Sequence, residues 1–74
     1  MEITKELQKR IKSEWQNIAK EEIDLQVIGG TPYAFCSELA ALRLAVKYPK
    51  QVFEGTAKAA FSKNRNTWFF VMEF

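Results

Sequence analysis

The beginning of the chain has the hydrophobic spacing of an amphipathic helix. Apolar residues recur every three or four positions from Ile3 to Ile18, at Ile3, Leu7, Ile11, Trp15 and Ile18. This period places them on one face of an α-helix. Thr4 is positioned to cap the helix, and Glu6 lies in the first turn, where the helix dipole favours a carboxylate. The spacing therefore predicts a helix with one buried stripe and a solvated outer face.

At residue 23 the spacing changes to an alternation of apolar and polar positions. The apolar positions are Ile23, Leu25 and Val27, and Gly29-Gly30 follows them. A glycine pair after an alternating segment is typical of a β-hairpin, because glycine adopts positive φ without strain. The returning strand is expected at Thr31 to Cys36. Pro32 should lie at its beginning or at a sheet edge, because proline cannot donate a ladder hydrogen bond.

A second helix is predicted from Glu38 to Tyr48, with Ser37 as its N-cap and Pro49 as its stop signal. Most of its residues are apolar, and the polar interruptions are Glu38, Arg43 and Lys47. We therefore expect a narrow solvated strip on a helix that is otherwise buried against a sheet.

The segment from Lys50 to Ser62 has two interpretations. It is either a loop followed by a strand, or a helix with Phe53, Ala57 and Phe61 on one face. The strand is favoured, because glycine is unfavourable inside a helix and Gly55 interrupts the segment. Residues 63–66 are typical of a turn, and the aromatic segment from Thr67 to Phe74 predicts a strand.

Together these elements predict an α+β fold with the order αββαββ. A small antiparallel sheet would carry two helices packed on one face. With 74 residues, the chain is expected to form one domain, residues 1–74.

The composition argues against several kinds of chemistry. The chain has no histidine and one cysteine, so it lacks the residues for histidine-dependent triads and for tetrahedral zinc sites with nitrogen and sulfur ligands. Glu21, Glu22 and Asp24 lie close in sequence, but adjacent acids diverge at the end of a helix. Cys36 is interpreted as a small buried residue. We therefore expect no enzyme, no catalytic residues, no metal site and no cofactor.

The composition also predicts the compartment. A single cysteine rules out an intramolecular disulfide, which favours a reducing environment. The charged beginning does not resemble a signal peptide, and no apolar run has the length of a membrane span. We expect a cytoplasmic protein without membrane contact.

The last strand suggests the function. Its alternation places one set of apolar residues on one face, namely Trp68, Phe70, Met72 and Phe74, and places Phe69 and Val71 on the other. Helices that cover only one face would leave apolar residues in water, which usually marks an interface; a strand buried on both faces is the alternative. We expect a protein-interaction module (an adaptor, an inhibitor or a homodimer) whose partner-binding residues are that first set. Its size is in keeping with an accessory protein of a phage or mobile element.

A nucleic-acid-binding accessory protein is the second possibility. Phosphate contacts from cations and base stacking on an aromatic ring are typical of single-strand recognition. The candidate residues are a basic hairpin with its neighbouring tryptophan and one cation of the second helix: Lys47, Lys58, Lys63, Arg65 and Trp68. A net charge of +2 lacks the strong basic excess of dedicated nucleic-acid binders. No RNP motif and no GxxG loop is present.

Overall fold

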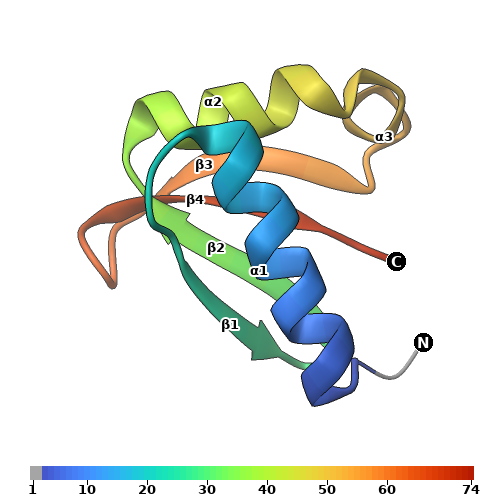
Figure 1. The fold of residues 1–74 in the computed structure, drawn as a ribbon. Coiled ribbons are helices and arrows are strands. Elements are labelled where there is room, and N and C mark those ends of the chain that lie inside the picture. Colours follow the sequence, from blue (N-terminus) through green and yellow to red (C-terminus); the bar gives the residue numbers. More distant parts are fainter. Residues whose placement is uncertain (1–2) are drawn as a thin grey trace.

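The computed structural model describes residues 3–74, which form three helices and a four-stranded antiparallel sheet (Figure 1). The elements in chain order are α1 (Lys5–Ala19), β1 (Asp24–Ile28), β2 (Thr31–Cys36), α2 (Glu38–Lys47), α3 (Pro49–Glu54), β3 (Ala57–Ser62) and β4 (Thr67–Met72). The strand order in the sheet is β1-β2-β4-β3, so β2 and β4 are the central strands.

The predicted first helix is confirmed as α1. Thr4 is its N-cap, and the Oγ1 atom of Thr4 accepts a hydrogen bond from the backbone N–H of Leu7 at 3.1 Å. The helix ends at Lys20, which adopts a left-handed conformation with φ of 60°. Ile11, Trp15 and Ala19 form its buried stripe.

The predicted hairpin is confirmed as β1 and β2. Gly29 and Gly30 form the turn with φ of 59° and 81°, the conformation for which glycine is favoured. Val27 lies opposite Pro32, and pairing with β4 begins one residue later, at Tyr33. Pro32 therefore lies just before the ladder with β4, so the missing N–H of proline does not interrupt that ladder.

The segment after α2 contains both a helix and a strand, the two alternatives that the sequence left open. Pro49 ends α2, as expected, and it also begins α3, because proline is favoured in the first turn of a helix. Gly55 ends α3 in a left-handed conformation with φ of 85°. The prediction of a strand is confirmed for β3, whereas the preference for a loop before it was wrong.

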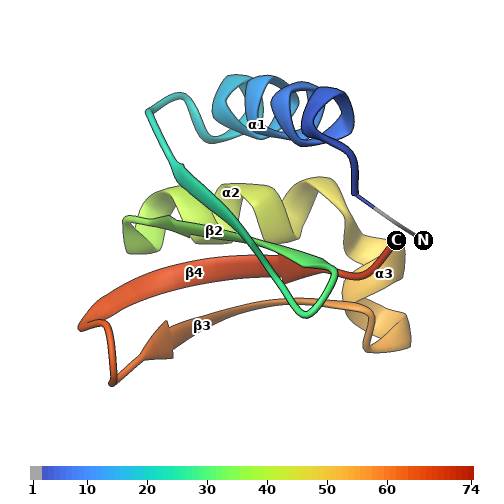
Figure 2. The ribbon, with the colours of Figure 1, turned by 90° about the horizontal axis from the view of Figure 1, so that it is seen from below.

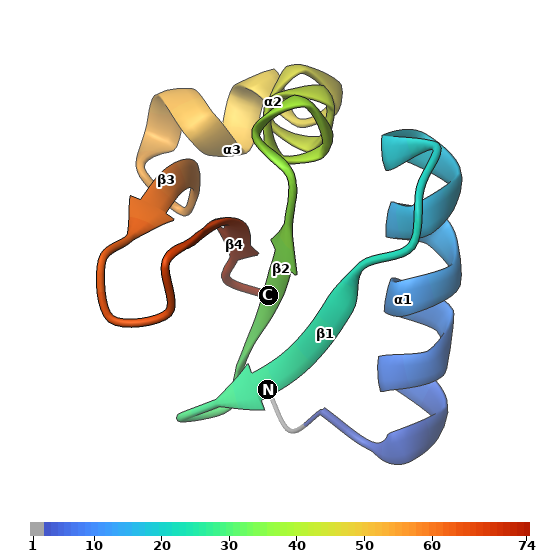
Figure 3. The ribbon, with the colours of Figure 1, turned by 90° about the vertical axis from the view of Figure 1, so that its left-hand side faces the viewer.

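The α+β class and the antiparallel sheet are confirmed, and α1 and α2 lie on the same side of the sheet (Figures 2 and 3). The insertion of α3 extends the predicted element order to αββααββ. Trp15 of α1 contacts Phe70 of β4 edge to face, with ring centroids 5.1 Å apart. The same core cluster contains small residues of α2 and β2, among them Ala34, Ala40 and Ala41.

The expected burial of α2 was wrong on its outer side. Ala40, Ala41 and Leu44 are buried against the sheet. Leu39, Leu42 and Val46 instead expose 57%, 44% and 78% of their surface. One side of α2 therefore packs on the sheet, and the apolar residues on its other side create the surface described next.

Candidate functional site

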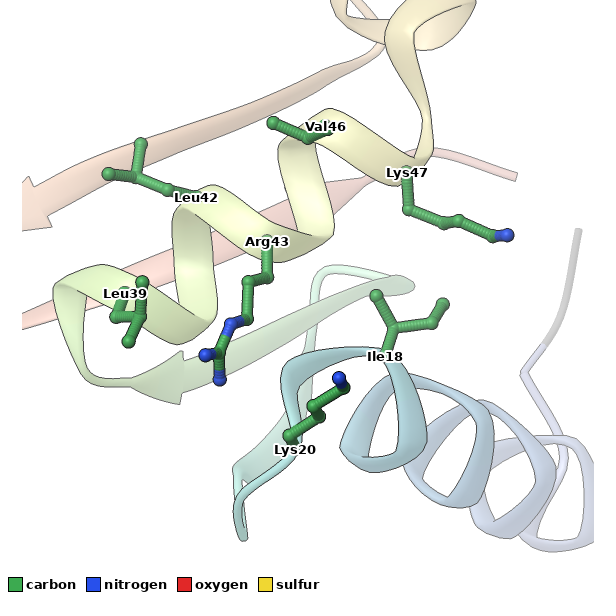
Figure 4. A pocket seen from close by; sticks show the side chains of 7 residues that line it. All are labelled: Ile18, Lys20, Leu39, Leu42, Arg43, Val46 and Lys47. Atoms are coloured by element: carbon green, nitrogen blue, oxygen red, sulfur yellow. The ribbon is translucent and has the colours of Figure 1, made fainter.

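A groove lies between the outer side of α2 and the end of α1 (Figure 4). Its volume is about 480 Å³, and its lining residues are Ile18, Lys20, Leu39, Leu42, Arg43, Val46 and Lys47. Ile18 belongs to the end of α1, Lys20 is the C-cap of that helix, and the other five project from α2. We call this feature the α2 groove.

Two sets of hydrogen bonds join the end of α1 to α2 and so shape the α2 groove. The Nη1 atom of Arg43 donates to the backbone carbonyl of Ala19 at 2.9 Å. In the connection after α1, the Oε1 atom of Glu21 accepts from the hydroxyl and the backbone N–H of Ser37. The Ser37 hydroxyl in turn caps α2 by accepting from the N–H of Ala40 at 3.2 Å. The two helices are therefore tied together at one end of the groove.

The α2 groove combines an apolar surface with charge of one sign. Ile18, Leu39, Leu42 and Val46 supply the apolar side chains, and the charged residues around them are Lys20, Arg43 and Lys47. Within residues 3–74, the lining includes no acidic side chain. Such a surface is complementary to a ligand that has apolar groups flanked by carboxylates.

Helix α3 adds a further exposed apolar residue beyond the α2 groove. Phe53 is 91% exposed, and no residue of α3 is buried. A single exposed apolar side chain is ordinary, but several on consecutive helices are typical of an interface.

A second distinctive surface lies on the side of the sheet opposite α1 and α2. Tyr33, Phe35 and Phe69 project there from the two central strands. Their ring centroids are 5.7 to 6.2 Å apart, and the rings of Tyr33 and Phe35 stack with 12° between their planes. The guanidinium of Arg65 lies 4.3 Å from the centroid of the Phe35 ring. We call this surface the open sheet face.

The structure separates the partner-binding residues that the sequence predicted. Phe70 and Met72 are buried in the core beneath the helices, so they present no surface to a partner. Trp68 is half-buried against the same core and contacts Phe61 edge to face. Phe74 is exposed and lies 6.3 Å from Trp15, measured between ring centroids. These four residues do not form one surface.

The residues predicted for nucleic-acid binding are also divided. Lys58 pairs with Val71 and so faces the open side of the sheet, as Arg65 does through its contact with Phe35. Lys63 lies in the same turn as Arg65, residues 63–66. Lys47 instead lines the α2 groove, and Trp68 packs toward the helices.

Sequence reasoning missed the exposed residues of α2. Leu39, Leu42 and Val46 follow the i, i+3, i+7 spacing of one helix face. This spacing was present in the sequence, but a helix with apolar residues on both faces does not reveal which face meets the sheet.

Cys36 occupies an environment that suppresses ionisation. Its Sγ atom donates to the backbone carbonyl of Ala34 at 3.4 Å. Burial, with a smaller contribution from the charge of Glu21, raises the pKa of the thiol to about 11. The thiol is therefore protonated at neutral pH and is a poor nucleophile.

Within residues 3–74, no group of three or more Cys, Asp or Glu side chains is placed to hold a metal ion. None of the helices described has the length and apolar character needed to cross a membrane. In comparisons with known proteins, no family model, no curated protein and no solved structure matches the chain. The two surfaces are therefore the features of the molecule that bear on its function.

Proposed function

We propose that this chain is a small, non-enzymatic protein-interaction module, an adaptor or inhibitor, that binds an acidic amphipathic helix of a partner protein in the α2 groove. The observation that carries the proposal is the outward placement of Leu39, Leu42 and Val46 on α2. The opposite side of this helix already packs on the core through Ala40, Ala41 and Leu44. Removing a fully exposed Leu or Val side chain from water contributes roughly 1.5 to 3 kcal/mol. A partner that covers these three residues would gain part of that energy from each.

The shape of the surface supports a helical ligand. An amphipathic helix binds a groove through apolar side chains at i, i+3 or i+4, and i+7. The α2 groove lies between two helix segments, and its apolar side chains come from both of them, Ile18 at the end of α1 and Leu39, Leu42 and Val46 on α2. Lys20, Arg43 and Lys47 would then meet acidic side chains on the flanks of the bound helix, which increases the rate of association and sets its orientation.

The proposal includes a cytoplasmic location. The lone Cys36 supports it, because stable small secreted domains usually depend on several disulfides.

The test is a titration of the isotope-labelled protein with a synthetic amphipathic helix that carries leucines on one face and glutamates on the flanks. We expect chemical-shift changes at Ile18, Leu39, Leu42 and Val46. A peptide with lysines in place of the glutamates should bind at least about tenfold more weakly, because each like-charge contact opposes docking.

A matched pair of variants makes the test specific. Leu42→Ser and Ile28→Ser each remove an apolar side chain of similar exposure, 44% and 43%, but Ile28 lies on β1, away from the groove. Leu42→Ser should weaken peptide binding roughly tenfold, as expected for loss of a central contact, and Ile28→Ser should leave it unchanged. Equal affinity for the acidic and basic peptides, or shifts confined to the sheet, would refute the proposal.

A further inference from the structure

We propose that the open sheet face is a second binding site, for single-stranded nucleic acid. It uses different residues from the α2 groove and does not depend on the function proposed above. The starting observation is that Tyr33, Phe35 and Phe69 form a compact group of rings on the central strands β2 and β4. Within residues 3–74, the helices that pack on the sheet lie on its other side.

Aromatic rings on an open sheet provide stacking partners for unpaired bases. Single-stranded RNA and DNA bind such surfaces because every base has a π face, and each stacked base contributes to affinity independently of sequence. The three rings are half-buried, so their positions are fixed by the sheet before a ligand arrives. A base would therefore meet a preformed surface, made of the rings of Tyr33 and Phe69 and of the Arg65 guanidinium that lies over Phe35.

Cations border the rings on the side of the β3–β4 hairpin. Arg65 lies over Phe35, and its Nη1 atom donates to the Oε1 atom of Gln26 at 3.2 Å. Neither contact is with a carboxylate, so the positive charge of Arg65 is not neutralised by these partners. Lys58 on β3 and Lys63 in the turn add two exposed cations. These residues are placed to contact the phosphates of a strand whose bases lie on the rings.

The acidic residues of this face limit the path of the strand. Asp24 lies on the edge strand β1 and accepts a hydrogen bond from the side chain of Gln26 at 2.9 Å. Glu73 follows the end of β4. A bound strand is therefore expected to run over β2, β4 and β3, where Lys58 and Lys63 lie, with Arg65 between the strand and Asp24 of β1. Duplex DNA is less suitable, because its bases are already stacked on each other.

The test measures fluorescence anisotropy of a labelled single strand of about 12 nucleotides, a length within the range that one small domain covers. Three phosphate contacts predict a slope of about −2 in a plot of log affinity against log salt concentration, or a loss of roughly 20-fold between 50 and 200 mM salt. Arg65→Gln should reduce the steepness of the slope by about 0.7. Phe69→Leu, which keeps an apolar side chain but removes the ring, should weaken binding roughly tenfold.

Controls on the other side of the molecule separate this inference from the proposed protein binding. Arg10→Gln on α1 makes the same charge change as Arg65→Gln, and Phe53→Leu on α3 matches Phe69→Leu. Both should retain full nucleic-acid affinity, as should Leu42→Ser. The inference would be overturned by absence of binding at 50 mM salt, by preference for a duplex, or by equal losses of nucleic-acid affinity in Arg10→Gln and Arg65→Gln. None of these outcomes bears on the α2 groove.

Discussion

At the scale of single residues, Cys36 shows how the environment decides chemistry. It is the last residue of β2 and directly precedes the N-cap of α2, a position at which a helix dipole lowers the pKa of many thiols. Here burial is the largest influence, and Glu21 acts in the same direction, so the pKa rises from an ordinary value of 9.0 to about 11. The sequence was interpreted as placing Cys36 in the core as a small buried residue; in the structure the side chain is half-buried.

This shift predicts slow alkylation and a loss of stability at alkaline pH. At pH 8 the thiolate fraction of Cys36 should be about 100-fold lower than that of an ordinary thiol, so iodoacetamide should react slowly until urea unfolds the chain. The unfolded thiol ionises first as pH rises, so the free energy of unfolding should decline between about pH 9 and 11. Burial also raises the pKa of Tyr48, which adds to the decline.

Urea unfolding of the wild type and of Cys36→Ala across this pH range measures the contribution of the thiol. The free energy of unfolding of Cys36→Ala should decline less steeply between about pH 9 and 11 than that of the wild type. Rapid alkylation of the folded protein, at the rate of a free thiol, would contradict the described environment of Cys36.

At the scale of elements, the joint between α1 and α2 depends on the interaction of Arg43 with the Ala19 carbonyl. This carbonyl lies at the C-terminal end of α1, where positive charge is favoured by the helix dipole. We expect Arg43→Gln to lower the free energy of unfolding by about 1 kcal/mol, the typical net contribution of one intramolecular hydrogen bond.

Lys47→Gln provides the matched control. It removes the same charge from the rim of the α2 groove, and Lys47 is an exposed residue of the same helix. Its effect on unfolding should stay below about 0.5 kcal/mol, as for most surface substitutions. Equal effects of the two substitutions in urea unfolding would show that the hydrogen bond to Ala19 contributes nothing.

The sequence predicted those elements whose hydrophobic period is unambiguous. The four-residue spacing from Ile3 to Trp15 fixed α1, and the alternation before Gly29 and Gly30 fixed the hairpin. Helix α3 was missed because six residues between Tyr48 and Gly55 are too few to show a period.

The candidate sites were predictable only in part, because a pattern assigns residues to faces but does not show what covers each face. The alternation of β4 correctly separated Phe70 and Met72 from Phe69 and Val71. It did not show that the helices lie over Phe70. The same limit applied to α2, where Ala40, Ala41 and Leu44 face the sheet and Leu39 and Leu42 face solvent.

At the scale of the whole molecule, the core separates two surfaces of different chemistry. The α2 groove is apolar with three cations around it, and the open sheet face combines aromatic rings with cations from the β3–β4 hairpin. Positive charge is therefore concentrated at two places on the surface, although the net charge is only +2. We propose that a chain with these surfaces acts as an adaptor, with a protein held on the helix side.

The most direct test of protein binding through the α2 groove is quantitative recovery of partners by the tagged chain from cells that express it. Wild type, Leu42→Ser and Ile28→Ser are compared by mass spectrometry, each with and without nuclease. We predict a specific protein that wild type and Ile28→Ser recover in both conditions and that Leu42→Ser loses. Equal recovery by both variants, or recovery that disappears with nuclease, would contradict a protein-docking role for α2.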